Sequence, residues 1–266
     1  MMLAKEIFLR KLMKHLSRIW YSYISRIDKN SEATFLNYGY ADNKKELQLL
    51  KNDESNRYPI QLYNHVATAI TLEGLDVLEV GCGRGGGTSF IARYLKPRSI
   101  IGVDLCKKSM NFCNKYYSIK GLSFSWRNAL NLLFKGENFH VVINVESSHC
   151  YEDINRFFNE VHRVLKPNGY FLFADFRNRK SITHLKEQLK KSQFNIIKEE
   201  IITHNVIKAL DIDNERRIEL IRKLVPKFLH KFTKNFSGIK GSKTYKSFVT
   251  GEKEYFYFVL KDTASH

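Results

Sequence analysis

A chain of 266 residues, 43% of them hydrophobic and 13% aromatic, is long and apolar enough to bury a sizeable core, which excludes a disordered or fibrous protein. Lys and Arg outnumber Asp and Glu by 44 to 27, and the formal net charge of +17 fits a nucleic acid, an anionic membrane or an acidic substrate, or simply basic solvated faces. The four cysteines show no metal-ligand or disulfide spacing, and no apolar run reaches the roughly 18 residues of a membrane span. We expect a cytoplasmic protein without a bound metal, with at most peripheral membrane contact.

The chain begins with an expected helix over residues 3–27, where apolar residues recur at helical spacing between basic ones. This amphipathic pattern favours packing on the domain, with a membrane-surface helix or a mobile lid as alternatives. The loop FLNYGYADN follows, and a second helix is expected over residues 59–70, behind Pro59.

From residue 75 onward, short apolar runs alternate with helical segments, as is typical of a largely parallel sheet covered on both faces. The expected strands are residues 77–80, 100–103, 122–126, 141–145, 170–174, 196–202 and 255–260. The expected helices between them are residues 88–94, 108–117, 153–165 and 182–191. The pattern predicts an α/β fold with a Rossmann-like, doubly wound, seven-stranded and mostly parallel sheet, preceded by N-terminal helices.

A long interruption, residues 205–251, separates the last two expected strands. It holds a basic helical stretch over residues 214–235, broken at Pro226, and the turn-rich segment SGIKGSKTYKSF. Because so long a connection commonly covers a site, we expect a helical cap inserted before the last strand, with an inert insertion or an oligomer contact as alternatives.

The stretch VLEVGCGRGGGTS places five glycines directly behind the first expected strand, where a doubly wound sheet binds its ligand. Gly81, Gly83 and Gly86 match a GxGxxG pattern formally, which brings a dinucleotide into consideration. Glu79 argues against a pyrophosphate, because a carboxylate repels phosphate and suits an ammonium or sulfonium group. Asp104 ends the second strand, where an acidic side chain accepts ribose hydroxyls of NAD or of any other adenosyl ligand.

These residues, with Asn128 and Ala129 after the third strand and LKPNGYFLFADF around the fifth, resemble the class I S-adenosylmethionine-dependent methyltransferases over about residues 58–202. More narrowly, FLNYGY, CGRGGGTSF, NVESSHCY and FFNEVHRVLKPNGYFLFADFR resemble the phthiotriol and phenolphthiotriol dimycocerosate methyltransferases, which O-methylate a lipid hydroxyl. Sugar O-methyltransferases share the Glu-Ser-x-His segment.

The resemblance implies a site for S-adenosylmethionine. Glu79 would help to hold its amino group, Asp104 would take the ribose hydroxyls, and Asn128 would border adenine where the family more often has aspartate. The cofactor-binding residues expected in this way are Glu79, Gly81, Cys82, Gly83, Asp104, Leu105, Asn128, Ala129 and Asn144. Arg84 departs from the family pattern, and the sequence assigns it no role.

Methyl transfer from a sulfonium requires an aligned nucleophile in a site emptied of water, and an alcohol must also lose its proton. His149, just beyond the fourth strand, suits this task near neutral pH, and Asp175, at the end of the next strand, is placed to orient the imidazole. Related sugar O-methyltransferases use a His and an Asp at the matching places. The alternative is that His149 hydrogen-bonds a loop and Asp175 caps the following helix.

The leading interpretation is an O-methyltransferase that acts on a hydroxyl of a lipid-like or natural-product small molecule, with His149 as general base. A nucleic-acid methyltransferase is supported by the charge alone, and a catalytically silent cofactor-binding protein is disfavoured by the pairing of His149 with Asp175. The chain would divide into a helix and lid region (1–57), a methyltransferase core (58–204), a substrate cap (205–251) and the last core strand with its tail (252–266). The identity of the acceptor and the oligomeric state stay open.

Overall fold

The computed structural model describes residues 27–28, 31–42 and 47–263, so the helix expected over residues 3–27 lies almost wholly outside the described residues. The centre of the molecule is one seven-stranded sheet with the strand order β3-β2-β1-β4-β5-β7-β6. Strand β7 runs antiparallel to both of its neighbours, and the other pairs are parallel. The strands are β1 Asp76–Val80, β2 Ser99–Asp104, β3 Leu122–Trp126, β4 Phe139–Val145, β5 Leu165–Asn178, β6 Phe194–Ile201 and β7 Lys253–Asp262. The predicted doubly wound, mostly parallel sheet is therefore confirmed.

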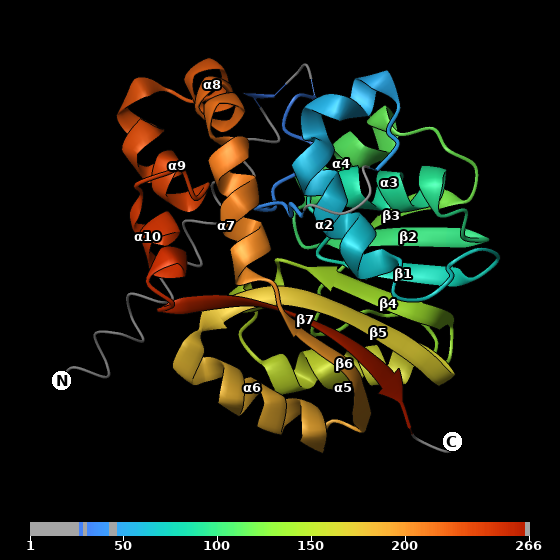
Figure 1. Cartoon of the computed structure of the whole chain (residues 1–266). Coiled ribbons are helices and arrows are strands. Elements are labelled where there is room, and N and C mark those ends of the chain that lie inside the picture. The colour runs from blue at the N-terminus through green and yellow to red at the C-terminus, as the bar shows by residue number, and fades with distance from the viewer. Residues whose placement is uncertain (1–26, 29–30, 43–46, 264–266) are drawn as a thin grey trace.

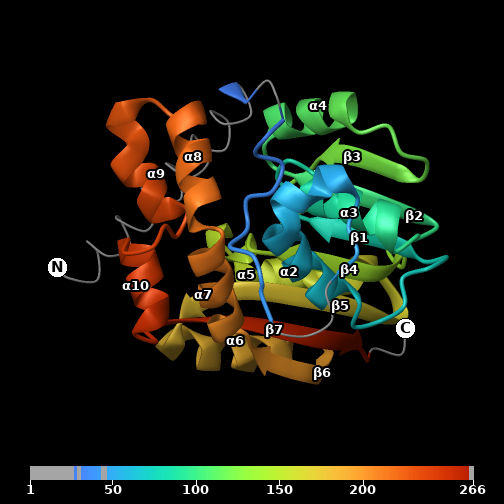
Figure 2. The ribbon, with the colours of Figure 1, turned by 45° about the horizontal axis from the view of Figure 1, so that its top comes forward.

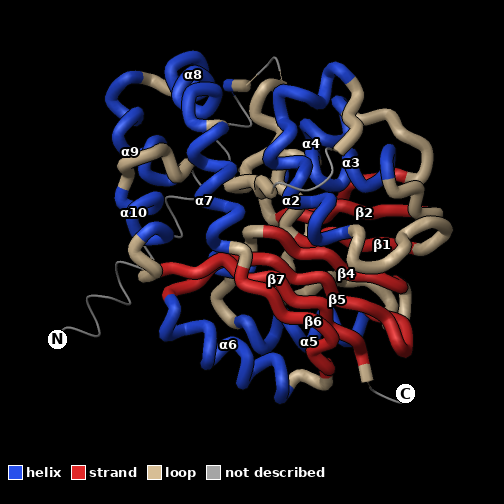
Figure 3. Tube along the Cα trace, in the orientation of Figure 1, coloured by secondary structure: helices blue, strands red, loops and turns tan. Residues whose placement is uncertain are grey.

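Helices cover both faces of the sheet, because successive strand residues point to opposite sides. Val77 of β1 joins one apolar core, which also contains buried residues of α2 (Arg57–Ala67) and α3 (Gly86–Tyr94). Leu78, the next residue, joins the opposite core, formed with α5 (Ile154–Val164) and α6 (Arg179–Lys191). Helix α4 (Lys107–Tyr116) completes the β2–β3 crossover. Figure 3 shows the sheet between these two layers.

Strand β5 is longer than the apolar run 170–174 that predicted it. It pairs with β7 as far as Asn178, which lies opposite Lys253, so Asp175 lies within the strand rather than at its end. Residues 175–178 escape a hydrophobicity pattern because three of the four side chains are polar, although the ladder with β7 holds their backbone.

The interruption before β7 is a group of helices at one end of the sheet, on the left in Figure 1. It comprises α7 Thr203–Ile212, α8 Asn214–Leu224, η3 Lys227–Leu229, α9 His230–Phe236 and α10 Lys243–Val249. The expected break at Pro226 is confirmed, since α8 ends just before it. The segment expected to be rich in turns contains α10, whose first turn is capped by the Ser242 hydroxyl accepting from the backbone N–H of Tyr245 at 3.2 Å. We call residues 203–250 the helical insertion.

Residues 31–42, the covering segment, run between the helical insertion and α2 (Figure 2). The backbone N–H of Tyr40 donates to the carbonyl of Tyr58 at 3.0 Å, and that of Ala41 donates to the carbonyl of Asn205 at 3.1 Å. The segment is therefore fastened on both sides. Within the described part of the chain, none of the helices combines the length and the apolar character that crossing a bilayer requires.

Candidate active site

A cavity of about 190 Å³ lies at the carboxyl ends of β1, β2 and β4, beneath the covering segment. This is the edge at which the chain switches from one side of β1 to the other, where open α/β sheets bind ligands. Among the residues expected to bind the cofactor, those on its wall are Gly81, Cys82, Gly83, Asp104, Leu105, Asn128 and Ala129. The structure thus gathers most of the expected cofactor site into one pocket.

Two of the expected cofactor residues, Glu79 and Asn144, are fully buried behind this wall. Glu79 accepts hydrogen bonds from the hydroxyls of Tyr63, at 2.7 Å, and of Thr88. Burial raises the pKa of Glu79 to about 7, although these two donors oppose the shift. Tyr63 itself lines the pocket, so the hydrogen bond to Glu79 fixes the position of a side chain in the pocket wall.

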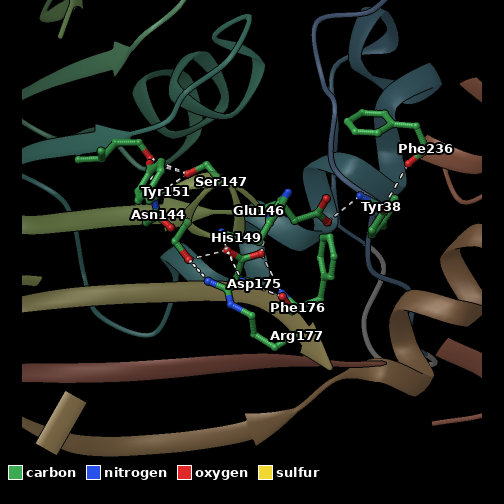
Figure 4. A network of polar contacts seen from close by, with 12 residues as sticks. Tyr38, Asn144, Glu146, Ser147, His149, Tyr151, Asp175, Phe176, Arg177 and Phe236 are labelled. Carbon is green, nitrogen blue, oxygen red and sulfur yellow. Dashed lines mark hydrogen bonds and ion pairs between the residues drawn. The ribbon is translucent and has the colours of Figure 1, made fainter. Parts of the chain in front are cut away.

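Asn144 organises the turn that follows β4, as Figure 4 shows. Its side-chain amide donates to the carbonyl of Val80 at 2.8 Å and to the hydroxyl of Ser147 at 2.7 Å. Ser147 and Tyr151, whose hydroxyls lie 2.9 Å apart, both line the pocket. Asn144 therefore holds two wall residues in place and joins the end of β4 to the end of β1.

The glycines of the first turn pack closely against side chains of the protein itself, and they also line the cavity. Gly81 has φ +79°, and a Cβ added there would lie 2.2 Å from the hydroxyl of Ser147. A Cβ added at Gly87 would lie 2.0 Å from the ring of Tyr63. Part of the glycine requirement that suggested a ligand thus comes from the close packing of the pocket wall.

Asp104 and Asn128 stand on the wall in orientations fixed by the backbone. The Asp104 carboxylate accepts from the N–H of Gly83 at 3.0 Å and from that of Cys106 at 2.8 Å. The Asn128 side-chain oxygen accepts from the N–H of Leu130 at 2.9 Å. Each side chain keeps lone pairs or N–H groups for further hydrogen bonds. Asp104 can therefore still accept from a ribose, and Asn128 can still bond to an adenine, as expected from the sequence.

His149 and Asp175, expected as a catalytic pair, are in contact (Figure 4). His149 Nδ1 lies 2.8 Å from Asp175 Oδ1, and since an ionised carboxylate only accepts, Nδ1 carries the proton and donates. The backbone N–H of His149 and the hydroxyl of Ser148 also donate to this carboxylate, at 2.9 and 2.6 Å, and Arg177 lies 3.1 Å from it. His149 and Asp175 do not themselves line the pocket, but Ser147 and Cys150, on either side of Ser148 and His149 in the chain, do.

The charges of this pair are set by their surroundings. Burial raises the pKa of Asp175, but the cations of Arg177 and His149 outweigh burial and hold it well below its usual value. Burial lowers the pKa of His149, but Cys150 and the Asp175 carboxylate outweigh burial and raise it to about 10. The aromatic ring of Phe176 covers the imidazole, with ring centroids 4.5 Å apart.

Glu146 is a pocket residue that the sequence analysis did not select. It has a left-handed backbone with φ 47° at the end of β4, and its carboxylate accepts from the backbone N–H of Tyr38 at 2.7 Å. Burial raises the pKa of Glu146 to about 7, and the nearby Asp175 carboxylate adds to the shift. The motif NVESSHCY contained this glutamate, but only the turn geometry reveals that its side chain faces the covering segment.

The structure gives Arg84, which had no role in the sequence analysis, a place in the covering of the pocket. Its guanidinium is fully buried, donates to the Asp28 carboxylate at 2.9 Å and lies over the ring of Phe112 at 3.8 Å. Asp28 in turn accepts from the backbone N–H groups of Glu32 and Ala33 at 3.0 and 2.9 Å. Arg84 therefore links the glycine-rich turn to the start of the covering segment.

Comparisons with known proteins agree with this arrangement. A family described as a methyltransferase domain matches residues 78–173. The chain belongs to the S-adenosylmethionine-dependent methyltransferases, and S-adenosylmethionine is its methyl donor. Within this family it is 37% identical to the phthiotriol/phenolphthiotriol dimycocerosates methyltransferase of Mycobacterium tuberculosis, over 94% of this chain and 93% of that protein. It is 36% identical to the fatty-acid O-methyltransferase of Mycolicibacterium smegmatis, over 85% of this chain and 83% of that protein.

Solved structures show the same fold at lower sequence identity. The cyclopropane synthase MmaA2 of Mycobacterium tuberculosis has a TM-score of 0.68 at 17% identity, covering 91% of this chain and 97% of that one. The geranyl diphosphate C-methyltransferase of Streptomyces coelicolor, solved with S-adenosyl-L-homocysteine, has a TM-score of 0.63 at 15% identity, covering 91% and 98%.

Proposed function

We propose that this methyltransferase transfers a methyl group to the hydroxyl oxygen of a lipid-like alcohol, with His149 as the general base. The observation that carries the proposal is the contact of His149 with Asp175 beside the pocket, at the end of β4. The two relatives named above modify lipids according to their names, which supports an apolar acceptor.

The proposed reaction needs little from the protein besides alignment and a proton acceptor. S-adenosylmethionine, when bound, supplies an electrophilic methyl group on a sulfonium. The acceptor oxygen forms a bond to the methyl carbon as the carbon–sulfur bond breaks, and the hydroxyl proton passes to His149 Nε2. Asp175 keeps Nδ1 as the donor and stabilises the imidazolium that forms. The products are a methyl ether, a neutral thioether and a proton on His149.

The presence of a base favours an alcohol over a carboxylic acid as the acceptor. A carboxylate is already ionised at neutral pH and has no need of a base. An alcohol is neutral when it binds and gains from a base nearby. The acceptor class proposed for this chain therefore differs from the fatty acid in the name of the Mycolicibacterium smegmatis relative.

We also propose that the helical insertion serves as the cap of the acceptor site. Its support is that Arg217 of α8 contacts the covering segment, which lines the pocket. Of the alternatives raised by the sequence, a nucleic-acid methyltransferase gains no support from the pocket, and a catalytically silent protein is at odds with the enzymatic names of the relatives.

The test uses a second His–Asp pair of the same chain as its control. His162 Nδ1 lies 2.8 Å from Asp262 Oδ1, with the histidine side chain 18% exposed against 21% for His149. Neither histidine is among the residues that line the pocket, but His149 lies in the segment between Ser147 and Cys150, which do line it, whereas no residue next to His162 does. We expect His149→Ala to lower kcat by about 10²- to 10⁴-fold, and His162→Ala to leave it within about 2-fold.

The assay measures transfer of labelled methyl groups to long-chain alcohols and to the corresponding fatty acids, with S-adenosylmethionine affinity determined separately by calorimetry. His149→Ala should bind S-adenosylmethionine nearly as well as the native protein. Unchanged turnover in His149→Ala would eliminate it as the base, and label in the fatty acids rather than the alcohols would overturn the proposed acceptor.

A further inference from the structure

The helical insertion carries an exposed aromatic side chain between two of its helices. Phe228 lies on η3, between α8 and α9, and is 84% exposed, the highest value among the exposed large hydrophobic side chains of the described residues. A single exposed phenylalanine is unremarkable on its own. Its neighbours along the chain give it significance, because Lys227 and Lys231 beside it are exposed as well.

The stretch of chain that contains Phe228 is strongly basic. Residues 220–250 contain eight Lys and Arg and no Asp or Glu. These residues are Arg222, Lys223, Lys227, Lys231, Lys234, Lys240, Lys243 and Lys246. Among the described residues, ion pairs are formed by Lys223 with Glu32 and by Lys240 with Asp211. The remaining six positive charges have no ion-pair partner within that described part of the chain. This part of the helical insertion therefore presents a positive electrostatic field that attracts anions.

An apolar groove of about 90 Å³ lies behind this surface, between α8, α9 and the covering segment. Leu220, Leu224 and Val225 line one side of it. Phe35 and Leu36 line the other side, and the same two residues also line the cofactor pocket. The groove thus lies between α8 and α9, the helices on either side of Phe228, and the part of the covering segment that also lines the cofactor pocket.

We propose that the basic tip, defined as Arg222, Lys223, Lys227, Phe228 and Lys231, docks on an anionic lipid bilayer and delivers an apolar acceptor from the bilayer to the groove. The proposal rests on the proposed lipid acceptor. Lysine and arginine side chains bind anionic head groups, and a phenylalanine beside them enters the boundary between head groups and acyl chains. An acceptor with long apolar chains is held in membranes, so an enzyme that acts on it must approach a bilayer.

Vesicle binding by the full chain tests the surface directly. We expect sedimentation with vesicles of phosphatidylcholine that contain about 30% phosphatidylglycerol, little sedimentation with phosphatidylcholine alone, and weaker binding at high salt. Phe228→Ser and the double variant Lys227→Glu/Lys231→Glu should each weaken binding by about 10-fold or more. The matched control is the double variant Leu133→Ser/Lys135→Glu, on an exposed loop after β3 where Leu133 is 69% exposed, and it should bind as the native chain does.

Equal binding to both kinds of vesicle, or native binding by the tip variants, would overturn the proposal. So would binding of single-stranded RNA that the tip variants lose while anionic vesicles are not bound, because the surface would then serve a nucleic acid.

A second measurement separates this proposal from the proposed function. Methyl transfer is compared for a long-chain alcohol held in anionic vesicles and for the same alcohol dispersed in a neutral detergent. We expect the tip variants to lose about 10-fold in the vesicle assay and to keep native turnover in detergent. Vesicle binding without transfer to any alcohol would refute the proposed acceptor alone. Transfer in vesicles that is unaffected by the tip variants would refute the docking surface alone.

Discussion

Arg217 of α8 donates from one guanidinium nitrogen to the carbonyl oxygens of Asn37 and Tyr38, at 3.0 Å each. Its Nε donates to the carboxylate of Asp213, the residue before α8, at 2.9 Å, so the guanidinium is held at the start of its own helix as well. Tyr38 then donates its backbone N–H to Glu146 in the pocket. A continuous line of polar contacts therefore joins the helical insertion to the wall of the active site.

Replacing Arg217 by Met should loosen the covering segment. Two carbonyl oxygens lose a charged donor in a buried place, and each lost hydrogen bond of this kind costs about 1–3 kcal/mol. We expect S-adenosylmethionine affinity to fall by about 10-fold and the melting temperature to drop. Arg216→Met is the control, since Arg216 binds the same Asp213 at 2.6 Å from a more exposed position. Equal losses in calorimetry for the two variants would argue against a specific role of Arg217.

Methyl transfer should become faster as the pH rises. With a pKa of about 10, His149 carries a proton at neutral pH in the free enzyme, and it acts as a base only in the fraction that has lost it. We expect log kcat/KM to climb with a slope near 1 from about pH 7 toward the pKa and then to level off. The positive sulfonium lowers the pKa of the imidazole, so the profile of kcat should turn at a lower pH.

Asp175→Asn supplies the control for this profile. Loss of the carboxylate charge removes a cause of the raised pKa, which moves the turning point to lower pH. The plateau rate should fall, because the asparagine amide no longer enforces the proton on Nδ1. A pH profile of the native enzyme that stays flat between pH 7 and 10 would contradict the role of His149 as general base.

Glu146 should make the folded state less stable as the pH rises. Its pKa of about 7 in the folded protein lies above the value of 4.5 for an unperturbed glutamate, so the folded state binds the proton more tightly. The resulting stability is fully present below pH 4.5 and is lost as the pH rises through 7. Glu146→Gln keeps an oxygen that can accept from Tyr38 and removes this dependence.

Thermal unfolding between pH 5 and 8 checks this expectation. Glu146→Gln should gain melting temperature relative to the native chain as the pH increases. Glu137→Gln is the matched control, because Glu137 also has a left-handed backbone, with φ 51°, but is exposed. A constant difference between Glu146→Gln and the native chain across this range would count against a buried, protonated Glu146.

Gly81→Ala should destabilise the protein far more than Gly74→Ala. Both glycines have a left-handed backbone, with φ +79° and +75°, and both substitutions therefore carry the same backbone strain. The added methyl group meets Ser147 at Gly81, whereas nothing lies within 4 Å of it at Gly74. We expect an extra loss of about 2 kcal/mol or more in chemical denaturation, together with loss of S-adenosylmethionine binding. Equal losses would show that strain alone accounts for the requirement.

Much of the site could be predicted because it depends on strand ends. Apolar runs located the strands, and the carboxyl ends of parallel strands meet at one edge of a sheet. For that reason His149 and Asp175, which are 26 residues apart, could be expected to meet, and they do, although Asp175 lies within β5 and not at its end. Asp104 and Gly83 come together by the same rule, 21 residues apart.

The contacts that cover the pocket could not be predicted in this way. Arg84 and Asp28 are 56 residues apart, and Arg217 and Asn37 are 180 residues apart, with no periodic pattern that relates them. Such pairs form only because the folded chain brings a loop next to a distant helix or turn, which no local sequence pattern indicates. Helix α10 was missed for a local reason, since glycine and serine predicted turns, whereas Ser242 serves as the N-cap of a helix.

The position of β7 has a consequence for how the protein is made. In the order β5-β7-β6, the edge strand β6 is hydrogen-bonded to β7, and it joins the rest of the sheet through β7. During synthesis β6 and the whole helical insertion leave the ribosome before β7 exists. The first part of the sheet, β1 to β5, can assemble as it emerges, but the remainder waits for the final strand. A nascent chain stalled before residue 253 would thus expose the edge of β5 and be a target for chaperones.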